Sequence, residues 1–329
     1  LMQPIAITLG DPAGIGPEVA AKVLAKVEPR TPWLLVGAPW SLEDGARVAS
    51  VDLPEIAVVD RATAMNGRGV ALLDVGISRP ADFRYGEVQA ACGEIAVNAV
   101  QRSAKACLAG ELAAMVTCPL NKEAIHAAGY VDDLGHQEIL ARLSGAEGTA
   151  TMLMTPGLRV AHLSTHKSLI EAARYVTRET VVGKLELIDS TLGRWGIGTP
   201  RIAVAALNPH GGEGGILGRE EIEELAPAVA DARALGIDAT GPIPSDSVFN
   251  RAINGEFDVV LALYHDQGHI AIKVHNFHES TTATLGIPFV RTSVDHGTAF
   301  DIAGQGLANE QGLVTAIQTA EQIVQGRLG

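Results

Sequence analysis

The feature that most constrains the fold is the alternation of short apolar runs with longer amphipathic segments along the chain. The apolar runs have the length and the β-branched content of buried strands, and the segments between them repeat apolar side chains at helical spacing. This order predicts βαβ units and a largely parallel sheet. The predicted strands are residues 5–9, 33–36, 113–118, 152–154, 160–165, 202–207 and 259–264, and the predicted helices are one beginning near Pro17 and residues 86–108, 122–128, 138–143, 178–192, 219–235 and 313–325.

The size and composition limit the class of protein. A chain of 329 residues is too long for one ordinary hydrophobic core and suits two domains of moderate size or one large divided domain. Its net charge of −13 argues against non-specific binding to nucleic acid or to an anionic membrane. Without a membrane-length apolar run or a signal-peptide pattern, we expect a cytoplasmic protein. Three cysteines without CxxC spacing predict small buried residues rather than a disulfide framework or a structural zinc site.

Three histidines lie at or just beyond the ends of predicted strands. His166 follows residues 160–165, His210 follows residues 202–207 after two further residues, and His265 follows residues 259–264. Ligands of open α/β sheets collect outside the carboxyl ends of the strands, so three imidazoles delivered there can converge on one site. Three neutral imidazoles predict a divalent-metal site with open positions for substrate. His162, inside an apolar run, is instead expected to be a core or interface histidine.

Other polar residues also stand at positions that can carry chemistry. The glycine-rich segment 10–18 joins a strand to a helix, either letting a ligand approach the backbone or shaping the rim of a site, and it is not a GxGxxG dinucleotide fingerprint. Arg291 follows the apolar residues 287–290 and is expected to be buried and functional. Lys273 and Thr282 lie in a region rich in donors for a phosphate or carboxylate. Asp246 and Asp266 are candidate acid/base or substrate-orienting residues, with a helix N-cap as the alternative role.

Several collinear motifs resemble those of one enzyme family along essentially the whole chain. They are residues 10–18, 119–122, 135–138, 207–210, 264–268 and 291–299. They resemble the 4-hydroxythreonine-4-phosphate dehydrogenase family of vitamin B6 biosynthesis, within the isocitrate/isopropylmalate dehydrogenase-like fold. The resemblance implies an α/β protein of two α/β/α domains with largely parallel sheets and an interdomain active-site cleft. We expect a first domain over residues 1–125 plus 270–329 and a second over 126–269.

The same resemblance implies an activity and its residues. The expected reaction is NAD- or NADP-dependent oxidation of the secondary alcohol of 4-phosphooxy-L-threonine to a β-keto acid that loses carbon dioxide. It implies a homodimer whose subunits share each metal site, with zinc expected and cobalt, nickel, iron, manganese or magnesium as alternatives. The expected residues are His166, His210 and His265 for the metal; His136, Gln137, Lys273, Thr282 and Arg291 for the substrate; Gly14, Gly16, Asp295, His296 and Gly297 for the cofactor; and Asp246 and Asp266 for catalysis.

Two departures from the family pattern keep the substrate open. Gln137 stands where the family usually has threonine, and Thr282 stands where it usually has asparagine. Both positions are expected to contact substrate, and Thr282 keeps one hydroxyl donor for an anion. The alternatives are threonate or erythronate 4-phosphate, an unphosphorylated hydroxy acid or a dihydrodiol carboxylate. A metabolite-binding protein without turnover is the non-enzymatic alternative.

Overall fold

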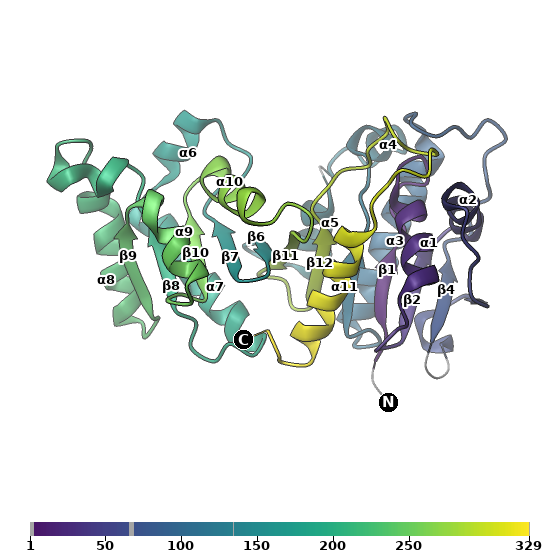
Figure 1. Ribbon diagram of the computed structural model, residues 1–329, viewed down its shortest axis with the longest axis horizontal. Helices are drawn as coiled ribbons and strands as arrows, with labels where there is room; N and C mark the ends of the chain where they lie inside the picture. Colours follow the sequence, from purple (N-terminus) through teal and green to yellow (C-terminus); the bar gives the residue numbers. More distant parts are fainter. Residues whose placement is uncertain (1–2, 66–68, 134, 329) are drawn as a thin grey trace. The chain divides into compact units, whose positions relative to one another are not determined.

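The computed structural model describes residues 3–65, 69–133 and 135–328. The chain divides into two compact units (Figure 1). Unit 1 consists of residues 1–147 and 287–324, and unit 2 consists of residues 148–286 and 325–329. The domain boundaries expected from the sequence, 1–125 plus 270–329 and 126–269, stay predictions. In the described part of the chain, no helix is both long enough and apolar enough to cross a membrane.

Unit 1 is a parallel sheet covered by helices on both faces. Its strand order is β3-β4-β2-β1-β5-β12, and each neighbouring pair is parallel. The strands are β1 Ile5–Thr8, β2 Trp33–Gly37, β3 Ala57–Val59, β4 Val70–Asp74, β5 Ala114–Thr117 and β12 Val290–Val294. The helices are α1 Gly16–Lys26, α2 Pro39–Ala49, the short 3-10 helix η1 Ala62–Ala64, α3 Ala90–Leu108, α4 Lys122–Ala127, α5 His136–Ser144 and α11 Gln311–Val324.

Alternation along β1 explains why both faces of this sheet are covered. Ile5 and Ile7 belong to a core cluster that includes residues of α1, α2 and α11. Ala6, between them, belongs to a second cluster with residues of α3, α4 and α5. Successive side chains of a strand point to opposite faces, so each face needs its own layer of helices. The predicted α/β class with a largely parallel sheet is confirmed.

Unit 2 is a mixed sheet with the order β11-β6-β7-β10-β8-β9. β6 is antiparallel to both of its neighbours, and the pairs from β7 to β9 are parallel. The strands are β6 Ala150–Thr155, β7 Leu158–His162, β8 Ile202–Ala205, β9 Ala239–Ile243, β10 Val259–Ala262 and β11 Thr281–Leu285. The helices are α6 Leu169–Tyr175, α7 Arg178–Arg194, the 3-10 segment η2 Pro209–Gly215, the π-helical turn η3 Glu221–Leu225, α8 Ala226–Ala234, α9 Ser245–Ile253 and α10 His265–His275.

Candidate functional site

In unit 1, the glycine-rich segment lies at the carboxyl edge of the sheet. Ile15 donates its backbone N–H to the carbonyl of Thr298 at 3.0 Å, which ties the segment to the chain after β12. A Cβ atom at Gly14 would lie 2.9 Å from the Cβ of Thr298, and one at Gly16 would lie 2.1 Å from the carbonyl oxygen of Leu9. Only glycine allows approaches this close. The structure thus gives both glycines a packing role, and their expected contact with a cofactor remains a prediction.

Arg291 is held at the same edge by the hydroxyl of Thr117. Its side chain lies on β12, beside β5, and is 8% exposed. Nε and Nη2 donate to Oγ1 of Thr117 at 3.1 and 2.8 Å, and that hydroxyl donates to Oγ of Ser293 at 2.9 Å. Burial lowers the pKa of Arg291 to about 10, so it is still a cation at neutral pH. The expected burial of Arg291 is confirmed, and the site offers a fixed positive charge for an anion.

His136 supplies a neutral imidazole close to this cation. It is the first residue of α5, and Gln137, half-buried, is the second. Burial, followed by the positive charge of Arg291, holds the pKa of His136 well below its usual 6.5. Its Nε2 atom is buried and has no hydrogen-bond partner among residues 3–65, 69–133 and 135–328. A buried nitrogen of this kind can bind a polar group of a ligand.

Asp11 is a buried carboxyl within the glycine-rich segment. Its Oδ1 accepts the backbone N–H of Ala13 at 2.8 Å, whereas Oδ2 has no partner within the described residues. Burial raises the pKa of Asp11 from 3.8 to about 6, more than the hydrogen bond from Ala13 lowers it. The side chain therefore takes up a proton just below neutral pH.

In unit 2, the three histidines predicted as metal ligands follow three neighbouring parallel strands. His166 lies four residues after the last residue of β7, and His265, the first residue of α10, follows β10. His210 lies in η2 after β8 with φ +53°, in the left-handed region, and Gly211 and Gly212 follow it in the same conformation. Because β10 pairs in parallel with both β7 and β8, all three histidines lie beyond the same edge of the sheet. All three are exposed.

Two of these imidazoles are oriented by carboxylates. Nδ1 of His210 lies 2.7 Å from Oε1 of Glu213, and this contact raises the pKa of His210. Nδ1 of His265 lies 2.7 Å from Oδ1 of Asp266. A carboxylate on one ring nitrogen fixes the orientation of the ring and leaves Nε2 for a metal, as metal-binding histidines commonly require. The donor chemistry therefore suits a divalent cation.

The described part of one chain does not by itself gather three such ligands. Among residues 3–65, 69–133 and 135–328, no group of three or more histidine, cysteine, aspartate or glutamate side chains is arranged to hold a metal ion. Within α10, the ring of His269 stacks on that of His265, with ring centroids 3.7 Å apart. Nδ1 of His269 lies 3.1 Å from Nε2 of His162. His162 is 1% exposed, so its expected place in the core is confirmed.

The remaining predicted residues of unit 2 are placed as follows. Asp246 is exposed in the first turn of α9, close enough to His210 for its charge to help raise that pKa, and the N-cap of α9 is Pro244. Asp266 is 72% exposed. Lys273 donates from Nζ to Oγ of Ser280 at 3.1 Å, and Thr282 is half-buried in β11. Their roles in catalysis and substrate binding stay predictions.

The predicted cofactor residues of the 295–297 segment directly follow β12. Asp295 and His296 are half-buried and Gly297 is exposed. Further along the chain, the backbone at Gly306 and Ala308 is hydrogen-bonded to side chains of α1. Lys22 donates from Nζ to the carbonyls of Gly306 and Ala308 at 2.9 and 2.6 Å, and Glu18 accepts the N–H of Ala308 at 2.9 Å. Glu18, the last residue of the 10–18 motif, thus fastens this segment to α1.

Sequence reasoning missed Thr117, Ser293 and Asp11 as parts of the candidate site. Thr117 is the last residue of β5 and the last but one of the strand predicted over residues 113–118. Its position near a strand end therefore indicated the carboxyl edge of the sheet. The raised pKa of Asp11 depends on burial, which no local pattern in the sequence encodes.

Comparison with known proteins gives consistent matches over nearly the full chain. A family model described as pyridoxal phosphate biosynthetic protein PdxA matches residues 29–320. A D-threonate 4-phosphate dehydrogenase of Pectobacterium atrosepticum is 41% identical, with 97% of this chain and 98% of the relative covered. A 4-hydroxythreonine-4-phosphate dehydrogenase of Beijerinckia indica is 42% identical, with 98% and 96% covered. A crystal structure of a 4-hydroxythreonine-4-phosphate dehydrogenase from Klebsiella pneumoniae has a TM-score of 0.90, 41% identity and 99% of each chain covered.

Proposed function

The chain belongs to the family of the pyridoxal phosphate biosynthetic protein PdxA, and from this membership we propose which hydroxy acid it oxidises and how. Its relatives are named as dehydrogenases of phosphorylated hydroxy acids, so the protein is an oxidoreductase acting on a CH–OH group of such a substrate with a nicotinamide cofactor. We propose 4-phosphooxy-L-threonine as the substrate. The secondary alcohol gives up a hydride to the nicotinamide and a proton to the protein, and the β-keto acid so formed loses carbon dioxide.

The observation that carries this proposal is the buried Arg291 held by Thr117. A substrate phosphate has a double negative charge, and a buried guanidinium with a fixed orientation binds it more strongly than an exposed one would. Neutral His136 can donate or accept a hydrogen bond beside that anion without adding a second charge. Lys273 and Thr282 of unit 2 are proposed to contribute to substrate binding, and Asp246 and Asp266 to move protons during the reaction.

We further propose that His166, His210 and His265 hold one divalent cation per site, zinc first among the candidates. When bound, such a cation lowers the cost of removing the alcohol proton and stabilises the charge that develops on decarboxylation. Since one described chain does not gather three ligands, the proposal requires a second copy. The three imidazoles would then be shared between the subunits of a homodimer.

Exposed apolar side chains support this homodimer. α6 and α10 follow β7 and β10, so both leave the same sheet edge as the histidines (Figure 1). Exposed side chains on and beside these helices are Leu169 at 65%, Ile170 at 66%, Ile270 at 59%, Val274 at 82% and Phe277 at 64%. Large apolar groups concentrated on two helices are typical of an interface between proteins. A second copy on this edge would cover them and bring further imidazoles to it.

A second candidate substrate is D-threonate 4-phosphate. It is favoured by relatives of that name at 41% identity over nearly the whole chain, and by Gln137 and Thr282 at positions where the sequence departs from the family pattern. The two substrates differ at C2, where one has an amino group and the other a hydroxyl group. A glutamine amide has both donors and an acceptor, so Gln137 can bond to either group.

Measured rates of NAD and NADP reduction test the proposal. The assay compares 4-phosphooxy-L-threonine and D-threonate 4-phosphate with their unphosphorylated counterparts, using wild-type protein, Arg291→Met and Arg251→Met. Arg251, whose side chain is 40% exposed and paired with Glu256, serves as the matched control. Loss of charged hydrogen bonds worth about 2–3 kcal/mol predicts a roughly 30- to 150-fold loss of kcat/KM for phosphorylated substrates in Arg291→Met alone. Faster turnover of an unphosphorylated substrate by the wild-type protein would contradict the proposal.

A further inference from the structure

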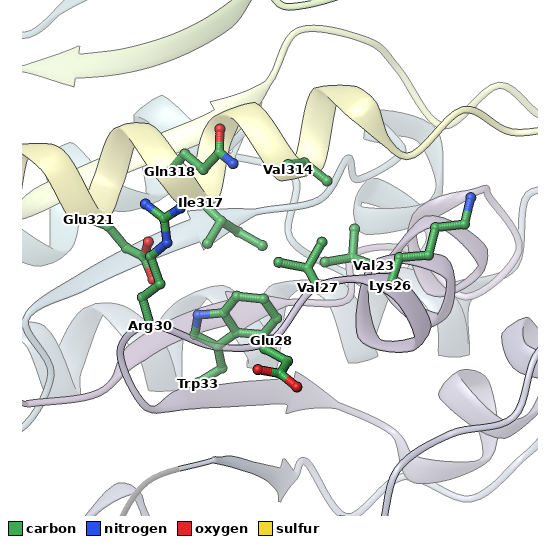
Figure 2. Close-up of a pocket in the computed structure, with 10 residues that line it drawn as sticks. All are labelled: Val23, Lys26, Val27, Glu28, Arg30, Trp33, Val314, Ile317, Gln318 and Glu321. Atoms are coloured by element: carbon green, nitrogen blue, oxygen red, sulfur yellow. The ribbon is translucent and has the colours of Figure 1, made fainter.

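A small pocket in unit 1 lies away from the residues described so far. It has a volume of about 240 Å³ and is formed by the end of α1, the start of β2 and one side of α11 (Figure 2). Trp33, which lines it, is the first residue of β2 and therefore lies at the amino edge of the sheet. Thr117 is the last residue of β5, at the carboxyl edge. The pocket and the candidate phosphate site thus lie at opposite edges of the same parallel sheet.

One part of the pocket is apolar. Val23 and Ile317 are each 2% exposed, and Val27 and Val314 are partly buried around them. The indole ring of Trp33 forms a further wall. Branched aliphatic walls and one aromatic face suit a short branched hydrocarbon group. The volume is below the 300–1,000 Å³ that is typical of sites for larger ligands, so the occupant has the size of a single amino acid.

The other end of the pocket is polar. Figure 2 shows three polar groups on the same side of the pocket: the indole nitrogen of Trp33, the carboxylate of Glu321 and the guanidinium of Arg30. Trp33 is 1% exposed, and its Nε1 has no hydrogen-bond partner anywhere in residues 3–65, 69–133 and 135–328. Glu321 is 6% exposed, and its Oε1 accepts a hydrogen bond from the hydroxyl of Thr31 at 2.8 Å. A buried donor without an acceptor therefore lies in the same pocket as a fixed buried carboxylate.

These groups select the charge of the ligand. A simple carboxylic acid would satisfy the indole N–H but would place its charge beside that of Glu321. A simple amine would suit Glu321 but would leave the indole N–H unpaired. A zwitterion satisfies both groups, because its carboxylate accepts from Nε1 and faces Arg30 while its ammonium group bonds to Glu321. A molecule with both charges next to an apolar group therefore matches Trp33, Glu321 and the apolar wall together.

We propose that this pocket binds a free α-amino acid with a branched apolar side chain, of the size of valine or leucine. The side chain packs against Val23, Val27 and Ile317, and the zwitterionic end lies against Trp33 and Glu321. The ligand bridges α1 and α11, which belong to the same core cluster. The site is separate from the proposed oxidation and can be occupied whether or not that reaction takes place.

Calorimetric titration of the whole protein tests this site. The probes are L-leucine, isoamylamine, which lacks the carboxylate, and 4-methylpentanoate, which lacks the ammonium group. We expect L-leucine to bind with a Kd of about 1 mM or lower and the two single-charge analogues to bind roughly tenfold more weakly or worse. No heat from L-leucine up to its solubility limit, or equal affinity for all three probes, would overturn the proposal.

Variants locate the binding. Trp33→Phe keeps an aromatic ring but removes the N–H, and Glu321→Gln removes the negative charge. Each is expected to weaken leucine binding by about tenfold. Val27→Phe fills the apolar part of the pocket and should abolish binding, while Val58→Phe, at a 59% exposed position of β3, is the matched control and should bind normally. If Val27→Phe folds with an unchanged circular dichroism spectrum and still binds leucine like the wild type, the site is not this pocket.

Discussion

Replacing Thr117 with valine tests whether Arg291 is held as described. The two side chains have nearly the same shape, and position 117 is 0% exposed, so packing is preserved. The substitution removes one oxygen that accepts from both Nε and Nη2 of Arg291 and that donates to Ser293. A buried cation thereby loses its two bonds to this hydroxyl.

The expected cost follows from the bonds that are lost. A hydrogen bond to a charged group contributes about 1.5–3 kcal/mol, and two bonds sharing one acceptor oxygen count for less than two independent bonds. We therefore expect Thr117→Val to lose about 2–3 kcal/mol of unfolding free energy. A less firmly held guanidinium also binds phosphate less well, so KM for the phosphorylated substrate should rise by roughly tenfold with a smaller change in kcat.

Urea denaturation and steady-state kinetics measure both effects, and the chain offers two controls. Thr117→Ser keeps the hydroxyl and should retain most of the stability and the wild-type KM. Thr155→Val makes the same change at a 7% exposed position whose hydroxyl has no partner within the described residues, so it should be neutral or stabilising. The reasoning is refuted if Thr117→Val is as stable as Thr155→Val and binds substrate like the wild type.

Three further predictions concern charged and titrating groups. Because burial raises the pKa of Asp11 from 3.8 to about 6, its contribution to stability is present below pH 3.8 and is lost as the pH rises to about 6. Between pH 4 and 7 the wild-type protein should therefore lose roughly 2.5 kcal/mol of unfolding free energy relative to Asp11→Asn, and parallel urea midpoints would contradict this. Because the folded pKa of His136 is held well below 6.5, the unfolding free energy of the wild-type protein should fall as the pH drops below 6.5. The unfolding free energy of His136→Gln should fall less steeply, and equal slopes against pH would argue against a buried neutral imidazole. Glu18→Gln keeps an acceptor for the N–H of Ala308 but loses the charge pair with Lys22, whose side chain is 12% exposed. Hydrogen exchange of the 306–308 amides should therefore accelerate several-fold. Glu43→Gln on α2 is the control and should leave that exchange unchanged.

The elements predicted best from the sequence are the strands that consist of a continuous run of apolar side chains. The runs that became β1, β2, β5, β8 and β10 are apolar because both faces of a central parallel strand are buried. β11 and β12 were not predicted as strands, since Thr281–Leu285 and Val290–Val294 contain threonine, serine and Arg291 in place of a continuous apolar run. The predicted helix over residues 219–235 is interrupted by a π-helical turn before α8, which apolar spacing does not reveal.

The candidate site was predictable only in part, because local features can be inferred from the sequence whereas contacts between distant residues cannot. A strand end is a local property, so the positions of His166, His210 and His265 beyond one sheet edge could be inferred from three separate runs. The contact of Thr117 with Arg291 joins residues 174 positions apart, and it exists because β5 pairs with β12. Nothing near either residue in the sequence specifies that pairing. The gathering of three imidazoles around a cation remains a prediction that depends on a second copy of the chain.

Mixing inactive subunits tests the shared metal site most directly. Three variants are made: His166→Ala, His210→Ala and His265→Ala. Each is expected to abolish NAD reduction as a homodimer. The variants are then mixed two at a time, and each of the three mixtures is denatured and refolded. If two ligands come from one subunit and one from the other, two of the three pairs should recover roughly a quarter of wild-type activity, since half of the dimers are mixed and each contains one intact site. The third pair should stay inactive. Full activity of any single variant, or recovery in none of the pairs, would contradict a metal held by these histidines across two subunits.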